Sequence, residues 1–189
     1  MKKTVPFIII FSAVFILSAN GCAGHHTTDP GEYGSNKYIS QTGFFPDSIE
    51  EYTVISYSYN SYDGYYTCTE VFLDITAGEE QLEQIINDAN NSEKITSKRQ
   101  AFYDPDYTEI VFRDDYEMSY EGKEGLNSGN EKARKVGSAD IEKIIYNRKT
   151  RNIIFEYFIA QAIGKYPFDE VEYFNRFDIT EEDYAHRFD

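Results

Sequence analysis

The chain has 189 residues, of which 33 are acidic and 18 are basic, giving a formal net charge of −15 at pH 7. This excess of negative charge argues against nucleic acid as a partner, because phosphates are repelled, and against electrostatic docking on an anionic membrane. A basic partner, a cation or simple solubility remains compatible with it. A chain of this length can bury enough apolar surface for one folded core.

The first 21 residues have the composition of an export signal. Lys2 and Lys3 precede an apolar run over residues 5–17, and small and polar residues follow it. Secretory signals combine a basic start with about 7–15 apolar residues, whereas a membrane-spanning helix needs about 20. We therefore assign residues 1–21 to a signal peptide and exclude them from the prediction of the fold.

The segment Ala19-Asn20-Gly21-Cys22 resembles the lipobox of bacterial lipoproteins. The resemblance implies cleavage before Cys22, lipidation of its sulfur and a position on the extracytoplasmic face of the cell membrane. Several acyl chains anchor a protein stably, because each buried methylene contributes about 0.8 kcal/mol. The alternative is ordinary signal cleavage, which releases a soluble protein. If Cys22 is lipidated, Cys68 has no cysteine left for an intramolecular disulfide.

Residues 22–45 are expected to form a flexible tether between the anchor and a single globular domain over residues 46–189. Glycine, proline, serine and threonine dominate the segment, and no apolar periodicity is visible. His25 and His26 lie in this tether. We interpret them as a solvated pair, because a metal site needs further ligands in a fixed geometry.

The domain is expected to begin with a hairpin and a helix. Residues 51–59 and 65–75 alternate with period two, which predicts two strands, and Asp63-Gly64 favours a hairpin turn between them. Thr76 and Glu79 fit a capping box. Apolar residues then recur at helical spacing, which predicts an amphipathic helix on one face of the sheet: Leu82, Ile85, Ile86 and Ala89.

Further strands are expected at 107–113, 141–146 and 152–159, the last two joined by a polar tip at 147–151. A helix over 153–163 stays open as an alternative. The glycine-rich residues 121–130 are expected to form a long loop, and residues 180–183 to cap a final helical turn. These elements predict an α+β fold with a mainly antiparallel sheet and one helix packed on one face.

The sequence contains no recognisable catalytic arrangement, and no cofactor is expected. Apart from His25 and His26, the third histidine lies at position 186, and no Gly-x-Ser-x-Gly motif is present. Cys68 lies within a predicted strand, and we interpret it as a packed side chain. Asp104 and Asp106 are weak calcium candidates only, because Glu109 stands where an EF-hand loop requires glycine.

Tyrosine is the most distinctive residue type, with 17 copies and no tryptophan. A tyrosine ring combines an apolar face with a hydroxyl group, which suits protein interfaces and sugar stacking. Cross-strand packing within the hairpin is the alternative role. Five tyrosines crowd the first hairpin and form our candidate binding surface: Tyr57, Tyr59, Tyr62, Tyr65 and Tyr66.

These observations predict a lipid-anchored lipoprotein of the cell envelope whose acidic, tyrosine-rich domain is a non-enzymatic binding or interaction module. Its partners are expected to be the membrane, through the lipid on Cys22, and an envelope protein or a glycan. Three alternatives stay open: an envelope hydrolase acting through carboxylates, an acidic inhibitor of an extracellular enzyme, and a structural component of an envelope complex.

Overall fold

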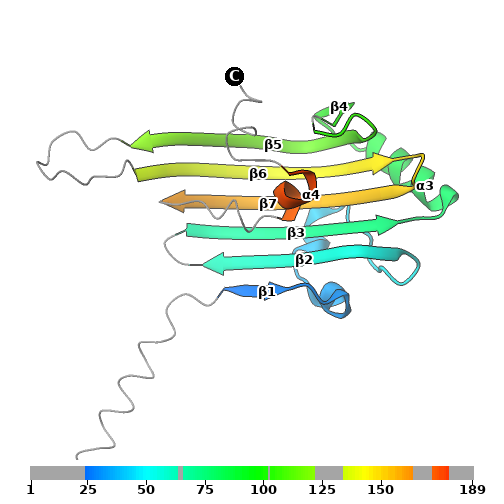
Figure 1. Ribbon diagram of the computed structural model, residues 1–189, viewed down its shortest axis with the longest axis horizontal. Helices are drawn as coiled ribbons and strands as arrows, with labels where there is room; N and C mark the ends of the chain where they lie inside the picture. Colours follow the sequence, from blue (N-terminus) through cyan, green and yellow to red (C-terminus); the bar gives the residue numbers. More distant parts are fainter. Residues whose placement is uncertain (1–23, 64–65, 102, 122–133, 164–171, 179–189) are drawn as a thin grey trace, which may run out of the picture.

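The computed structural model describes residues 24–63, 66–101, 103–121, 134–163 and 172–178. Its main feature is one seven-stranded sheet of order β1-β2-β3-β7-β6-β5-β4 (Figure 1). Every strand pairing is antiparallel. The strands are β1 (His25–Thr27), β2 (Thr53–Asp63), β3 (Tyr66–Thr76), β4 (Ser97–Gln100), β5 (Thr108–Glu121), β6 (Arg134–Asn147) and β7 (Asn152–Ile163). The helices are η1 (Pro30–Ser35), α2 (Ile39–Thr42), α3 (Glu79–Asn90) and α4 (Glu172–Phe177).

Both predicted hairpins are confirmed. β2 pairs with β3, and β6 pairs with β7. β7 also pairs with β3 over its whole length, so the helical alternative for residues 153–163 is wrong. Most of the predicted loop at 121–130 and the predicted cap at 180–183 lie outside the described residues.

The expected α+β fold is wrong, because the structure is dominated by its sheet and the helices are small. β5 and β6 have 14 residues each and extend well beyond the predicted segments 107–113 and 141–146. Their added residues are largely polar and acidic, so an apolar alternation does not reveal them. In the sheet, these residues are held in strands by backbone pairing between β5 and β6.

The expectation of a flexible tether does not hold for residues 24–45, which fold onto the sheet. β1 pairs with β2 through His25–Thr27, and Tyr33, Ile39 and Phe45 are buried in the core. Asp29 caps η1, because its Oδ1 accepts the N–H of Gly31 at 2.9 Å. These three buried residues are six positions apart, wider than the three- or four-residue spacing of a helix, which is why no helical periodicity marks them.

α3 confirms the predicted helix, but its N-cap residue lies two positions after the expected cap at Thr76. Gly78 is its N-cap residue, and the side chain of Gln81 accepts the N–H of Gly78 at 2.9 Å. The apolar stripe of α3 is buried against the sheet through Leu82, Ile86 and Ala89.

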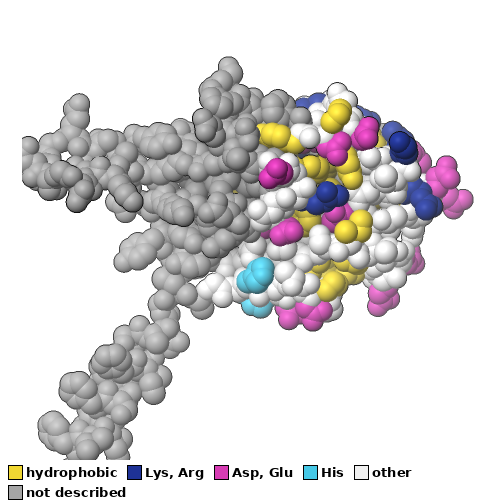
Figure 2. Space-filling view, in the orientation of Figure 1, with side chains coloured by type: hydrophobic (Ala, Val, Ile, Leu, Met, Phe, Trp, Pro, Cys, Tyr) yellow, Lys and Arg dark blue, Asp and Glu magenta, His cyan; other side chains and the backbone are white. Residues whose placement is uncertain are grey.

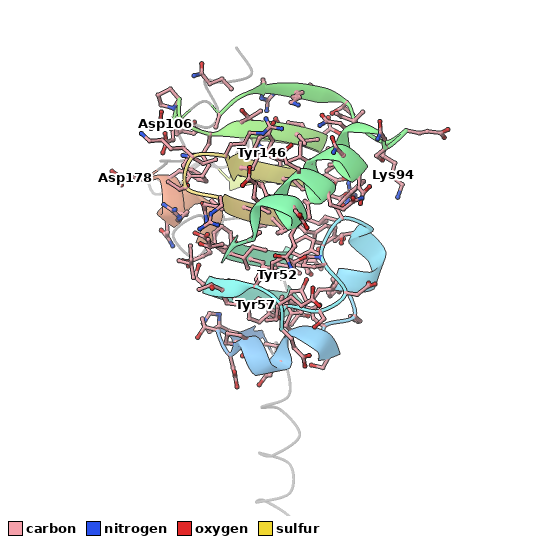
Figure 3. The ribbon with its side chains drawn as sticks, turned by 90° about the vertical axis from the view of Figure 1, so that its right-hand side faces the viewer. Tyr52, Tyr57, Lys94, Asp106, Tyr146 and Asp178 are labelled. Atoms are coloured by element: carbon pink, nitrogen blue, oxygen red, sulfur yellow. The ribbon has the colours of Figure 1, made fainter. Side chains whose placement is uncertain are left out.

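The sheet is covered on both sides. On the side that we call the α3 face, α3, α2 and η1 pack on apolar strand residues, among them Leu73, Ile75, Phe112, Ile144 and Phe155. The opposite side, which we call the α4 face, carries a second apolar cluster that includes Phe72, Ile141, Ile145, Ile154 and Phe158, with Phe177 of α4 packed against it. Figure 3 shows Lys94, beyond α3, and Asp178, beyond α4, on opposite sides of the sheet.

None of the helices among the described residues is long and apolar enough to cross a lipid bilayer.

Candidate functional site

A pocket of about 230 Å³ lies at the β1 edge of the sheet, where β1 and β2 meet η1. Figure 2 shows the histidine side chains at this edge of the molecule, beside acidic side chains. Figure 3 shows Tyr57 where the sheet meets the N-terminal helices. The pocket is lined by His25, Thr27, Glu32, Ser35, Asn36, Lys37, Tyr57 and Tyr59.

Asn36, at the C-terminal cap of η1, is held in place by two hydrogen bonds. Its Nδ2 donates to the hydroxyl of Tyr57 at 3.3 Å, and its Oδ1 accepts the N–H of Tyr38 at 2.9 Å. The amide therefore joins the helical segment to strand β2. A side chain fixed in this way presents its polar atoms to a ligand with little loss of conformational entropy on binding.

Tyr57 forms the floor of the pocket and is only 3 % exposed. Its ring lies edge-on to that of Tyr33, with 5.6 Å between the centroids. Burial raises the pKa of Tyr57 above its ordinary value, and the hydrogen bond from Asn36 opposes this only in part. The hydroxyl therefore stays neutral near pH 7, so it retains a proton that it can donate to a ligand.

The rim carries aromatic rings and a close contact between an imidazole and a carboxylate. The ring of His25 lies 5.4 Å from that of Tyr59, which in turn lies 6.1 Å from the ring of Tyr38. Nε2 of His25 lies 3.6 Å from Oε2 of Glu32, and both side chains are about half exposed or more. A pair this exposed contributes little to stability, so these groups are available for recognition.

The neighbouring His26 takes no part in the pocket. Its Nδ1 is within hydrogen-bonding distance of Oδ1 of Asn60 on β2. His25 and His26 therefore engage different partners. Among the residues that the structure describes, no three or more histidine, cysteine or acidic side chains are arranged to hold a metal ion.

Ser35 in this pocket is not positioned as a catalytic nucleophile. Ser35 lies beside His25 and Glu32, but its hydroxyl donates to the backbone carbonyl of Glu32 at 2.7 Å. A catalytic serine instead donates its proton to a positioned base. The charges of Glu32 and Lys37 balance, so the pocket as a whole has no strong preference for an anion or a cation.

The structure places the candidate residues predicted from the sequence in different parts of the molecule. Tyr57 and Tyr59 line the pocket, whereas Cys22, Tyr65 and the side chains of Tyr62 and Tyr66 lie outside the described residues. Asp104 and Asp106 form a turn, in which Oδ1 of Asp104 accepts the N–H of Asp106 at 3.0 Å. Cys68 is buried on the α4 face.

Sequence reasoning missed most of this pocket. Six of its lining residues come from the segment that was expected to be a flexible tether. One local signal was present: Asp29 followed by Pro30 is a helix start, with a capping side chain and a proline in the first turn.

Sequence reasoning also missed a set of buried ionisable residues on the α4 face. Nζ of Lys143 is fully buried and lies 3.1 Å from Oδ1 of Asp114. Arg99 on β4 pairs with the same Asp114, and its Nε lies 2.9 Å from Oε2 of Glu109. Each of these charges therefore has an opposite charge beside it, which a buried charge requires.

A second part of this set ties α4 to the sheet. Asn152 accepts a hydrogen bond from the hydroxyl of Tyr107 at 2.8 Å and donates to Asp74. Nε of Arg176 on α4 lies 2.9 Å from Oδ2 of Asp74, which is itself fully buried. The ring of Phe177 packs edge-on against Tyr107.

Glu156 on β7 is the exception within this set. It is fully buried, and neither carboxyl oxygen has a hydrogen-bond partner among the residues that the structure describes. Burial raises its pKa well above the ordinary value, the charge of Glu70 raises it further, and Lys143 opposes the shift. The cross-strand neighbours of Glu156 are Phe72 and Lys143. A carboxyl group in this position is stable in its neutral, protonated form.

No protein-family model matches the chain, and comparison with curated proteins and with solved structures finds no match.

Proposed function

We propose that the chain is an exported lipoprotein, anchored through Cys22, whose folded domain binds a small neutral polar ligand without transforming it. The ligand class that fits best is a sugar unit of an envelope glycan. The observation that carries the proposal is the pocket at the β1 edge, in which Tyr57 and Tyr59 meet hydrogen-bonding groups of both polarities.

The donor and acceptor set supports a ligand rich in hydroxyl groups. Asn36 and Lys37 can donate, and the carboxylate of Glu32 and the hydroxyl oxygen of Ser35 can accept. Tyr59 offers an aromatic face of the kind that packs on the apolar face of a sugar ring. The charges of Glu32 and Lys37 balance. A charged ligand would pair with one of them and leave the other without a partner, and a neutral ligand avoids this cost.

The size of the pocket supports the same ligand class. Pockets for drug-sized ligands enclose about 300–1,000 Å³, and this one encloses about 230 Å³. The site therefore suits one sugar ring, or the end of a chain, rather than a long stretch of polymer.

Two experiments test the proposal. Mass spectrometry of the protein from its native host should find Cys22 as the acylated N-terminal residue. For binding, the full chain is titrated with glucose, galactose and N-acetylglucosamine by saturation-transfer NMR, and with a lysine-rich peptide as the competing ligand class. We expect sugar binding that Tyr59→Ala and Glu32→Gln weaken and that Tyr59→Phe retains.

The matched control is Glu80→Gln on α3, which removes the same charge from an exposed position away from the pocket. It should leave sugar binding unchanged. Binding of the lysine-rich peptide in place of the sugars, or equal loss of sugar binding in Glu80→Gln and Glu32→Gln, would refute the proposed pocket.

A further inference from the structure

The pocket is held close to the membrane, because the folded domain begins almost directly after the anchoring residue. β1 starts at His25, which is also a pocket residue. His25 is three positions after Cys22, and a fully extended chain gains at most about 3.3–3.6 Å per residue. The backbone of His25 therefore lies within roughly 10 Å of the backbone of a lipidated Cys22.

The rest of the sheet is directed away from this anchor point. β1 forms one edge of the sheet and β4 forms the other. Adjacent strands lie about 4.8 Å apart, so six spacings separate the two edges by roughly 25–30 Å. A domain attached at the β1 edge thus holds that edge at the bilayer surface, with the pocket, while the β4 edge can stand clear of it.

This placement narrows the ligand class. We propose that the pocket binds the sugar headgroup of a neutral membrane glycolipid, an inference that rests on the lipid anchor and the sugar-binding pocket proposed above. A headgroup sugar projects from the same bilayer that holds Cys22, so anchor and ligand share one surface and binding gains from a high effective concentration.

The charge of the protein favours a neutral headgroup over an anionic one. Cleavage before Cys22 removes Lys2 and Lys3, so the anchored protein is more acidic than the −15 of the whole chain and is repelled by anionic lipids. The pocket contains both Glu32 and Lys37, so these two charges give it no net positive charge. The short connection after Cys22 holds the acidic domain near the bilayer. This position is favourable only if the headgroups near the pocket carry little negative charge.

The first experiment measures the distance of each sheet edge from the bilayer. The lipidated protein is placed in vesicles with acceptor-labelled headgroups, and a donor dye is attached to Gly34→Cys or, as the matched control, to Lys98→Cys. Gly34 lies on η1 with open space around it, and Lys98 lies on β4. Lipidation blocks Cys22 and burial protects Cys68, so the dye reports from the introduced position.

We expect strong energy transfer from position 34 and much weaker transfer from position 98. Equal transfer from both positions, or stronger transfer from position 98, overturns the placement of the pocket at the membrane. The sugar-binding proposal is unaffected by that result, because it is measured in solution.

The second experiment identifies the source of the sugar. The mature chain that begins at residue 22, with Cys22→Ser, is mixed with phosphatidylcholine vesicles that do or do not contain monoglucosyl diacylglycerol, with free methyl glucoside as competitor. We expect binding only to the glycolipid vesicles, displacement by the free glucoside, and about tenfold weaker binding by Tyr59→Ala. Binding of free sugars without binding to glycolipid vesicles overturns this inference and leaves the proposed function standing, whereas loss of both refutes the two together.

Discussion

The β1-edge pocket and the α4 face both gather ionisable residues, but they use them in opposite ways. In the pocket, Glu32 and His25 are about half exposed or more, and they form one weak pair. On the α4 face, Lys143 and Glu156 are fully buried. An exposed group can exchange water for a ligand at a low cost in free energy. A buried group depends on its neighbours for compensating interactions, and losing them costs much more. The comparison teaches that the exposed set suits recognition and the buried set controls stability and its pH dependence.

The largest effect should come from removing a charge on the α4 face. Lys143→Met leaves Asp114 without its buried ammonium partner, and breaking a buried pair costs about 3–5 kcal/mol. We expect a loss near 3 kcal/mol, because Arg99 also pairs with Asp114. Urea denaturation at pH 7 measures it. A loss below about 0.5 kcal/mol would show that this pair does not hold the α4 face together.

The next effect concerns the hydrogen bonds that connect α4 to the sheet. Asn152→Ala removes the partner of both Tyr107 and Asp74 and should lower the free energy of unfolding by about 1–3 kcal/mol. Hydrogen exchange of the backbone amides of residues 172–177 should increase in the same variant. Unchanged exchange at these amides would show that the hydrogen bonds of Asn152 do not help to hold α4 on the sheet.

Glu156 should make stability depend on pH. Because its pKa is raised in the folded state, the folded protein keeps a proton that the unfolded chain releases once the pH exceeds the ordinary carboxyl pKa. Stability is therefore fully present at low pH and falls as the pH rises toward the folded-state pKa. The charged groups that face Glu156 are Glu70 on β3, Lys143 on β6 and Glu172 on α4.

Glu156→Met should remove this dependence and stabilise the protein by about 1–3 kcal/mol at pH 8, with a smaller gain at pH 5. Chemical denaturation at both pH values measures the difference between variant and wild type. Glu80→Gln on α3 is the charge control and should follow the wild type. If Glu156→Met instead destabilises the protein at pH 8, the carboxylate is ionised and paired with Lys143.

The smallest effect on stability should come from the pocket. Glu32→Gln and Tyr59→Phe should each change the free energy of unfolding by less than about 0.5 kcal/mol, because Glu32 is about half exposed and the Tyr59 substitution keeps the aromatic ring. Thermal unfolding of both variants beside wild type checks this. A large loss of stability would mean that these side chains are structural rather than available to a ligand.

The strands that hold the two regions were predictable from alternation or from apolar runs that flank a polar turn. β2 and β3 alternate clearly, whereas β6 and β7 were predicted from the apolar runs on either side of residues 147–151. Phe155 and Glu156 illustrate its limit: they are neighbours on β7, they point to opposite faces, and both are buried. Period two assigns the acidic residue to solvent, which fails when the sheet is covered on both sides.

The pocket was predictable only through its tyrosines. Tyr57 and Tyr59 were found because the first hairpin is rich in aromatic residues, but the pairing of β1 with β2 joins residues 32 to 36 positions apart, such as His26 and Asn60. Such long-range contacts leave no periodic trace in a short polar segment. The ion pairs of the α4 face are equally hidden, since Arg99 meets Asp114 only after β4 and β5 have paired.

The most direct test asks whether ligands bind at the β1-edge pocket and not at the α4 face. It maps the chemical shifts of the backbone amides during titration with N-acetylglucosamine, glucose and galactose. The account predicts shifts that are confined to residues 25–37 and 57–59, which carry the pocket. Shifts that cluster instead at residues 172–177 and Tyr107, with the pocket amides unmoved, would contradict it.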